Sequence, residues 1–322
     1  GKATLLYAQG SNIWRNQELQ KNGELGKPIN WGDETEMKNE ALKIAKEADV
    51  IVCAMGECAD MSGECGSRTN LEMPDVQHEL LAELVKLGKP VVLLNFAGRP
   101  TVLTWEKQHV PAIMNVWFGG SEMGDALCDV LFGDKVPSGK LTTSMPKTTG
   151  QEPIYYNHQN TGRPVADDNK KFAKFASNCL DVSNGPLYPF GYGLSYTTFE
   201  YSNFRLSSQE ADINGNQEAT EWQNGKNITA TITVKNTGNR DADEIVQLYI
   251  RDMVASISRP VKELKGFQRI HLAVGESKQV SFEITPDMLK FYNADLKHII
   301  EPGDFQIMIG TNSKEVEALN FN

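Results

Sequence analysis

The stretch DVIVCAMG at residues 49–56 decides how the first half of the chain folds. It is a nearly unbroken apolar run without polar alternation, which is typical of a strand buried on both faces. The stretches PVVLLNF at 90–96 and PAIMNVW at 111–117 have the same character, and residues 4–8 are also predicted to form a strand. Between and around these runs, apolar residues recur at helical spacing, which predicts helices over 35–48, 75–87, 99–108 and 121–132.

Apolar strands that alternate with helices indicate a parallel or mixed sheet with helices on each side. We therefore predict an α/β three-layer sandwich over residues 1–150. In sheets of this kind, ligands meet the loops at the carboxyl ends of the strands. The loop that follows the strand at 49–56 is the first place to look for chemistry.

The pattern changes twice after residue 150. Residues 151–198 are rich in Pro, Gly, Asn and Tyr, and we predict an ordered connector there. Residues 199–322 show alternating apolar positions broken by turn signals, which predicts an all-β sandwich of the fibronectin type III or immunoglobulin kind. Its clearest strand-like runs are 228–234, 245–250, 278–284 and 305–309.

The composition is that of a two-domain globular protein and excludes several function classes. The 322 residues carry a formal net charge of −10, which disfavours nucleic acid as a partner. The longest apolar runs are too short to span a membrane. The chain enters strand-like sequence directly at GKATLLY, so we expect it to be a piece of a longer protein.

Motifs for phosphate, zinc and serine chemistry fail on inspection. The segment 133–140 resembles a P-loop, but Leu141 stands where a Ser or Thr is needed to bind magnesium. His78 and Glu79 begin a zinc-protease pattern whose second histidine is replaced by Ala82. The histidines are scattered, so we expect neither a metal site nor a cofactor. A disulfide between Cys58 and Cys65 is compatible with their spacing but is not indicated by it.

The loop GECADMSGECGSRTNLEMP at 56–74 concentrates carboxylates, an arginine and glycines after the first buried strand. Composition alone fits a solvated acidic surface loop. Its pattern SGExxSRT, followed by Leu71 and by Met73-Pro74, resembles the acid/base loop of glycoside hydrolase family 3. Further stretches resemble that family in the same order: GKPVVL at 88–93 with GRP at 98–100, WFGGSEMG at 117–124, LFGD at 131–134 with PSGKL at 137–141, YPFGYGLSYT at 188–197, and VKELKGF at 261–267.

The resemblance implies a retaining, exo-acting β-glycosidase of the periplasmic β-glucosidase type, in which Glu64 is the general acid/base. Retention needs a second carboxyl group as nucleophile. In the family this is an aspartate on an N-terminal barrel domain, and that domain is not in this chain. The chain alone is therefore expected to be inactive, and its partners are the missing barrel and a β-glucoside or oligosaccharide substrate.

The other polar residues carry weaker expectations. Arg68 binds substrate, orients Glu64 or pins the loop by a charged hydrogen bond. Asn160 and Arg163 are candidate substrate-binding residues. Glu57 and Asp60 are interpreted as hydrogen-bond partners or solvated groups and not as catalysts. The resemblance also implies a periplasmic or extracellular location. The alternative to an enzyme is a non-catalytic sugar-binding or scaffolding module.

Overall fold

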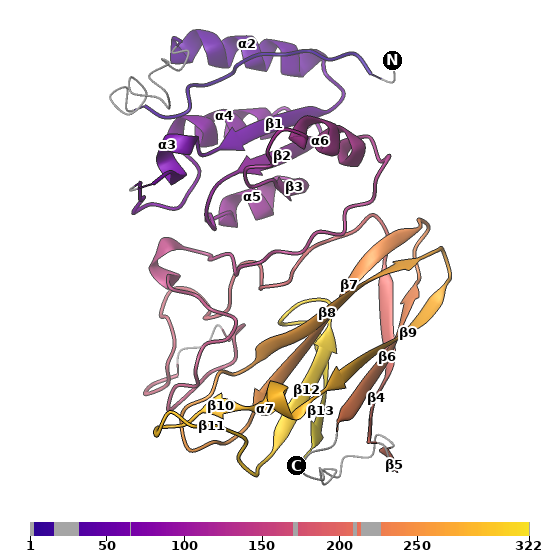
Figure 1. Cartoon of the computed structure of the whole chain (residues 1–322). Helices are drawn as coiled ribbons and strands as arrows, with labels where there is room; N and C mark the ends of the chain where they lie inside the picture. Colours follow the sequence, from indigo (N-terminus) through magenta and orange to yellow (C-terminus); the bar gives the residue numbers. More distant parts are fainter. Residues whose placement is uncertain are drawn as a thin grey trace. The chain divides into compact units, whose positions relative to one another are not determined.

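A computed structural model describes residues 3–15, 32–64, 66–169, 173–208, 211–213 and 227–321. The chain divides into two compact units (Figure 1). The first contains residues 1–123 and 145–152, and the second contains 124–144 and 153–322.

The first unit is built on a parallel sheet of three strands in the order β1-β2-β3. The strands are β1 (Ile51–Gly56), β2 (Val91–Phe96) and β3 (Ala112–Asn115), as the apolar runs predicted. The connecting helices are α4 (Asp75–Val85) and α5 (Thr104–His109). Right-handed crossovers in one direction place both helices on the same face of the sheet.

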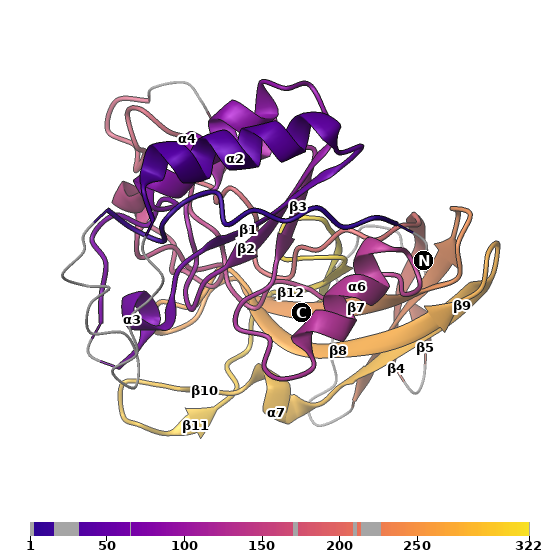
Figure 2. The same cartoon turned by 90° about the horizontal axis from the view of Figure 1, so that it is seen from above.

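One face of this sheet carries the core of the unit. Ile51, Cys53 and Met55 of β1 pack with Leu81 and Leu84 of α4. Helix α2 (Glu34–Glu47) lies along α4 (Figure 2), and the Asp33 carboxylate caps it by accepting from the amides of Thr35 and Glu36.

The sequence predicted a strand at 4–8 and a first sheet strand buried on both faces, and both expectations were wrong. Residues 4–8 form no strand, because no strand of the described residues pairs with them, and Leu5 is 91% exposed. On the face of β1 opposite α4, Val52 is 48% exposed. The predicted helix at 99–108 begins only at Thr104, after Val102 has formed a bridge to Glu72.

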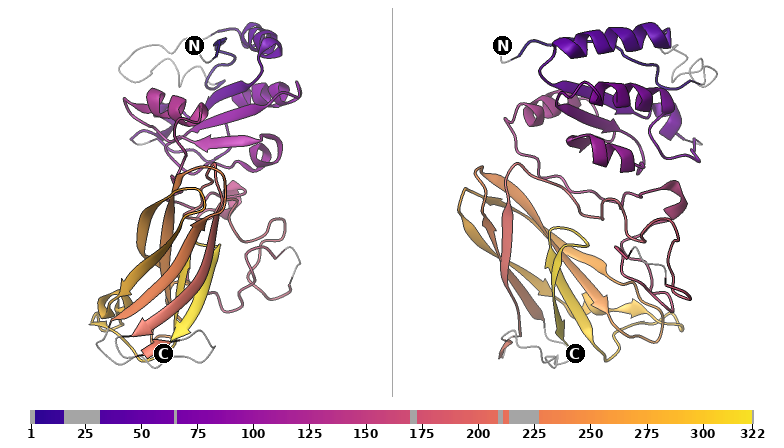
Figure 3. Two further views of the ribbon diagram at one scale, coloured as in Figure 1. Left: turned by 90° about the vertical axis from the view of Figure 1, so that its right-hand side faces the viewer. Right: turned by 180° about the vertical axis from the view of Figure 1, so that it is seen from behind.

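The second unit is an antiparallel sandwich of two four-stranded sheets (Figure 3). One has the order β13-β12-β7-β8 and the other β5-β4-β6-β9. Their inward side chains form one apolar core, because alternate residues of strands such as β6 face inward. The bounds are β4 (Phe199–Ser208), β5 (Ala211–Ile213), β6 (Ile228–Asn236), β7 (Ala242–Asp252), β8 (Glu263–Leu272), β9 (Ser277–Ile284), β12 (Phe305–Gly310) and β13 (Val316–Phe321).

Smaller elements complete the chain. Helix α3 (Ala59–Ser62) follows β1, α6 (Met123–Leu131) follows β3, and a 3₁₀ turn covers Thr149–Gln151. The sandwich adds the short helix α7 (Pro286–Leu289) and the hairpin of β10 (Phe291–Tyr292) with β11 (His298–Ile299). Among the described residues, every helix is too short or too polar to cross a bilayer.

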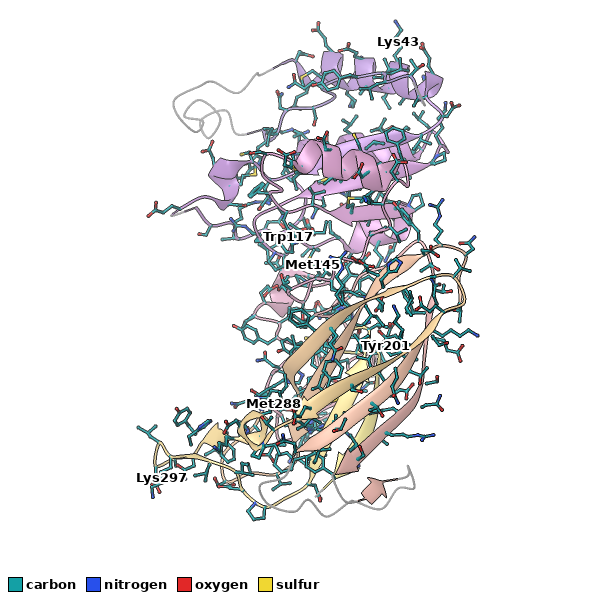
Figure 4. All side chains as sticks on the ribbon, turned by 45° about the vertical axis from the view of Figure 1, so that its right-hand side comes forward. Lys43, Trp117, Met145, Tyr201, Met288 and Lys297 are labelled. Carbon is teal, nitrogen blue, oxygen red and sulfur yellow. The ribbon has the colours of Figure 1, made fainter. Side chains whose placement is uncertain are left out.

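The segment 124–144 packs with the sandwich unit through polar contacts. The Tyr196 hydroxyl donates to the Val130 carbonyl over 2.9 Å, and Arg240 donates to the Gly133 carbonyl. Lys140 pairs with the buried Glu244 at 3.0 Å. Tyr201, labelled in Figure 4, donates to the same Glu244 oxygen, and burial raises the pKa of its phenol.

Candidate active site

The candidate loop leaves the carboxyl end of β1 through a conformation that requires glycine. Gly56 has φ +134°, and a Cβ on it would lie 1.9 Å from the Phe96 carbonyl oxygen. Its amide donates to the Gln77 side chain over 2.7 Å, and the next amide, of Glu57, donates to Phe96. The backbone is thereby fixed to the edge of the sheet where the loop begins.

The first carboxylate of the loop, Glu57, is buried, with 1% of its side chain exposed. One oxygen accepts from Arg68 Nη1 at 2.9 Å and lies 3.3 Å from Arg99 Nε. The other oxygen accepts from the Ser62 hydroxyl and from the Gly98 amide at 3.4 Å. Burying a carboxylate costs free energy unless it is paired and hydrogen-bonded, so the Glu57 carboxylate and these partners fix one another's positions.

Arg68 is committed to this cluster. Its side chain is 8% exposed, Nη2 donates to the Glu72 carbonyl over 2.9 Å, and the guanidinium lies 5.8 Å from the centre of the Trp14 ring. The pairing with Glu57 and Glu72 gives the loop-pinning role weighed for Arg68 a geometric basis. The substrate-binding role of Arg68 stays a prediction, and little of its guanidinium is accessible to a substrate.

Arg99, which follows β2, reaches the loop from a neighbouring strand end. Its Nη2 donates to the Met61 carbonyl and lies 3.5 Å from the Gly66 carbonyl. Within the loop, the Gly66 amide donates to the Gly63 carbonyl over 3.1 Å, which closes a tight turn. The turn and the arginine together define the backbone on each side of residue 64.

Glu64 lies in this turn with an exposed side chain. Within the described ranges, its carboxylate forms neither a hydrogen bond nor an ion pair, so it is open to an incoming group. Asp60, in α3, is also exposed. Cys65 lies outside the described residues, and Cys58 is a free cysteine.

Asn160 and Arg163 belong to the second unit, so their role beside Glu64 stays a prediction. Both are exposed. Arg163 Nη1 donates to the Phe175 carbonyl over 3.3 Å, and the guanidinium lies 5.9 Å from the centre of the Phe175 ring. Phe175 has φ +68°, an unusual value for a residue other than glycine.

A groove of about 520 Å³ runs along the free edge of β1, between it and residues 7–13. The amide side chains at its wall are used internally: Gln77 Nε2 donates to the carbonyls of Ile13 and Gly56, and Asn12 exchanges two hydrogen bonds with Gly32. The groove therefore offers few polar groups from these residues to a sugar.

Sequence reasoning missed Arg99 and Gly98 as parts of the site. The sequence signal for them is the GRP turn at 98–100, which follows the second buried strand. Among the residues described, no group of three or more His, Cys, Asp or Glu side chains is placed to hold a metal ion.

Comparisons with known proteins identify the family and several relatives of this chain. Residues 6–196 match the glycosyl hydrolase family 3 C-terminal domain, and 244–313 match a fibronectin type III-like domain. The periplasmic β-glucosidase of Salmonella typhimurium is 45% identical over 322 residues, 99% of this chain and 40% of that protein. The thermostable β-glucosidase B of Acetivibrio thermocellus is 35% identical over 320 residues, 98% and 38% of the two chains.

Solved structures give the same result. A β-glucosidase from Listeria innocua, in complex with glucose, superposes with a TM-score of 0.80 at 37% identity, covering 92% of this chain and 39% of that one. A β-glucosidase from Erythrobacter marinus gives 0.81 at 32% identity, covering 98% and 40%. The chain thus spans about 40% of the length of its relatives. The predicted order, an α/β sandwich followed by a fibronectin type III-like sandwich, is confirmed, and the chain belongs to glycosyl hydrolase family 3.

Proposed function

We propose that this chain supplies the general acid/base, Glu64, of a retaining, exo-acting β-glycosidase whose nucleophile lies in another part of a longer protein. In the first step Glu64 gives a proton to the departing glycosidic oxygen while the nucleophile bonds to the anomeric carbon. In the second step the Glu64 carboxylate takes a proton from water, the water oxygen bonds to the anomeric carbon, and the bond from that carbon to the nucleophile breaks, which releases the sugar.

The observation that carries this proposal is the contrast between Glu64 and its surroundings. Its carboxylate is exposed, while Arg99 contacts the backbone carbonyls on both sides of it and pairs with the buried Glu57. An acid that serves a substrate bound by another domain needs both properties, because it must be accessible and its position must be reproducible. The loop also follows the carboxyl end of a parallel strand, where α/β sheets place their sites.

The substrate class proposed is terminal β-linked glucosides and related β-linked sugars. It is supported by the names of the relatives, which include β-glucosidases and β-xylosidases. The likeness to a periplasmic β-glucosidase supports a location in the periplasm or outside the cell. The isolated chain should be inactive, because it carries one of the two carboxyl groups.

The test is Glu64→Gln in the full-length protein, assayed as kcat/KM on two substrates. For cellobiose, whose leaving group needs a proton, kcat/KM should fall by about 10²- to 10⁴-fold. For 2,4-dinitrophenyl β-glucoside, whose leaving group departs unprotonated, it should fall by less than about tenfold. Asp60→Asn, a neutralised exposed carboxylate of the same loop, is the matched control and should change neither value.

A second variant separates the acid/base from other roles. With Glu64→Ala and added azide, the small anion should enter the vacated space and attack the glycosyl-enzyme, so that β-glucosyl azide accumulates. Near wild-type cellobiose hydrolysis by Glu64→Gln would overturn the proposal.

A further inference from the structure

We propose that Glu57 is the positioning residue of the acid/base: its buried carboxylate ties together the two sides of the turn that presents Glu64. This inference rests on the proposed function, because it assigns Glu57 an effect on the step in which Glu64 delivers its proton. Glu57 itself does not touch the substrate in this assignment.

The contacts of Glu57 reach both sides of residue 64. On the near side, the Ser62 hydroxyl donates to one carboxylate oxygen. On the far side, Arg68 Nη1 donates to the other oxygen over 2.9 Å. The chain therefore leaves Glu57, returns to it at Ser62, passes through Glu64 and returns again at Arg68. Glu64 sits on a closed loop with two attachments to one buried group.

Arg99 provides a second set of attachments that depends on the first. Its Nη2 contacts the carbonyls of Met61 and Gly66, which again flank Glu64. Its Nε lies 3.3 Å from the carboxylate of Glu57. This contact is an ion pair without a hydrogen bond. Because a guanidinium is planar and rigid, the attraction of Nε to the carboxylate also restricts where Nη2 lies. Neutralising Glu57 would loosen both sets of attachments.

Burial makes these contacts stiff. The side chains of Glu57 and Arg68 are 1% and 8% exposed, so water cannot replace a lost partner without a rearrangement of the loop. Retention requires the two carboxyl groups about 5–5.5 Å apart. A displacement of about 1 Å is enough to cost about 10²-fold in rate. The rate should therefore decrease for substrates whose leaving group must be protonated.

The experiment is Glu57→Gln in the full-length protein, measured as kcat/KM on cellobiose and on 2,4-dinitrophenyl β-glucoside. We expect about a 10²-fold loss for cellobiose and less than about threefold for the activated glucoside. A merely structural role would reduce the amount of active enzyme and lower both values by one factor. The matched control is Glu106→Gln, because Glu106 is equally buried in the same unit but pairs with His78 away from the loop.

A second variant keeps the inference testable if Glu57→Gln does not fold. Ser62→Ala removes one attachment and leaves the ion pair with Arg68, so it should show the same selective loss at about five- to tenfold. Equal losses on both substrates, or no loss, in a folded variant would overturn the positioning role while Glu64→Gln kept its own selectivity. If Glu64→Gln lacked that selectivity, the proposed function itself would fail.

Discussion

The buried ion pair of Lys140 and Glu244 allows a quantitative test of how the sandwich unit is held together. The side chains are 12% and 4% exposed, and Lys140 Nζ lies 3.0 Å from Glu244 Oε1. At this distance and an effective dielectric constant of ~20, the attraction is roughly 5–6 kcal/mol. Lys140→Met removes it and leaves the carboxylate buried, for which we expect a loss of about 3–5 kcal/mol in unfolding free energy.

The loss should depend on pH in a direction that the pKa of Glu244 determines. Burial raises this pKa above 4.5, and Lys140 opposes the rise. A raised carboxylate pKa favours the neutral form in the folded protein, so the associated stability is complete below about pH 4.5 and is lost as pH rises through the folded value. In Lys140→Met the opposing charge is gone, so the variant should approach wild type at low pH and be weakest near neutral pH.

Urea unfolding of the chain, followed by far-ultraviolet circular dichroism between pH 4.5 and 7.5, measures this effect. The control is Lys297→Met, because Lys297 is 71% exposed and its partner is 3.8 Å away. It should leave the transition of the sandwich unchanged at every pH. A loss for Lys140→Met that is the same at pH 4.5 and at pH 7.5 would refute the reasoning.

Three further outcomes follow from the structure. Gly56→Ala should destabilise the first unit by more than about 3 kcal/mol in urea unfolding, because the new Cβ meets the Phe96 carbonyl at a strained φ. Gln77→Leu should cost about 2–3 kcal/mol, since it leaves polar groups of Gly56 and Ile13 without a partner. Calorimetric titration of the isolated chain with glucose and cellobiose should show no millimolar binding, and a saturable signal would favour the sugar-binding module.

Most of the fold was predictable because the spacing of apolar residues within each segment indicates whether it forms a helix or a strand. The stripe of Leu80, Leu81 and Leu84 predicted α4, and the apolar runs predicted β1 and β2 to within two residues. The edge strand β8 was not recognised as a strand, since Phe267, Arg269 and His271 are exposed and, of the inner residues after Gly266, only Leu272 is fully buried. The run at 4–8 shows the opposite failure, because apolar character predicts a strand only where a neighbouring strand exists to pair with it.

The candidate site likewise contains one part that the sequence predicted and one part that it did not. Glu64 was identified because the consecutive residues SGExxSRT resemble the acid/base loop of glycoside hydrolase family 3, whereas composition alone fitted a solvated acidic loop. The buried anchor was not, because Glu57 and Arg99 are far apart in the sequence and meet only when β1 and β2 pair in parallel and bring their carboxyl ends together.

By itself, therefore, the sequence determined the identity of the elements, the family and the candidate acid, all of which depend on local patterns. Only the tertiary structure decided which of the charged residues in the loop is buried and which is presented to solvent. The reason is physical: burial of a carboxylate requires partners from other segments, and the Gly98 amide and the Arg99 guanidinium reach Glu57 only in the folded sheet.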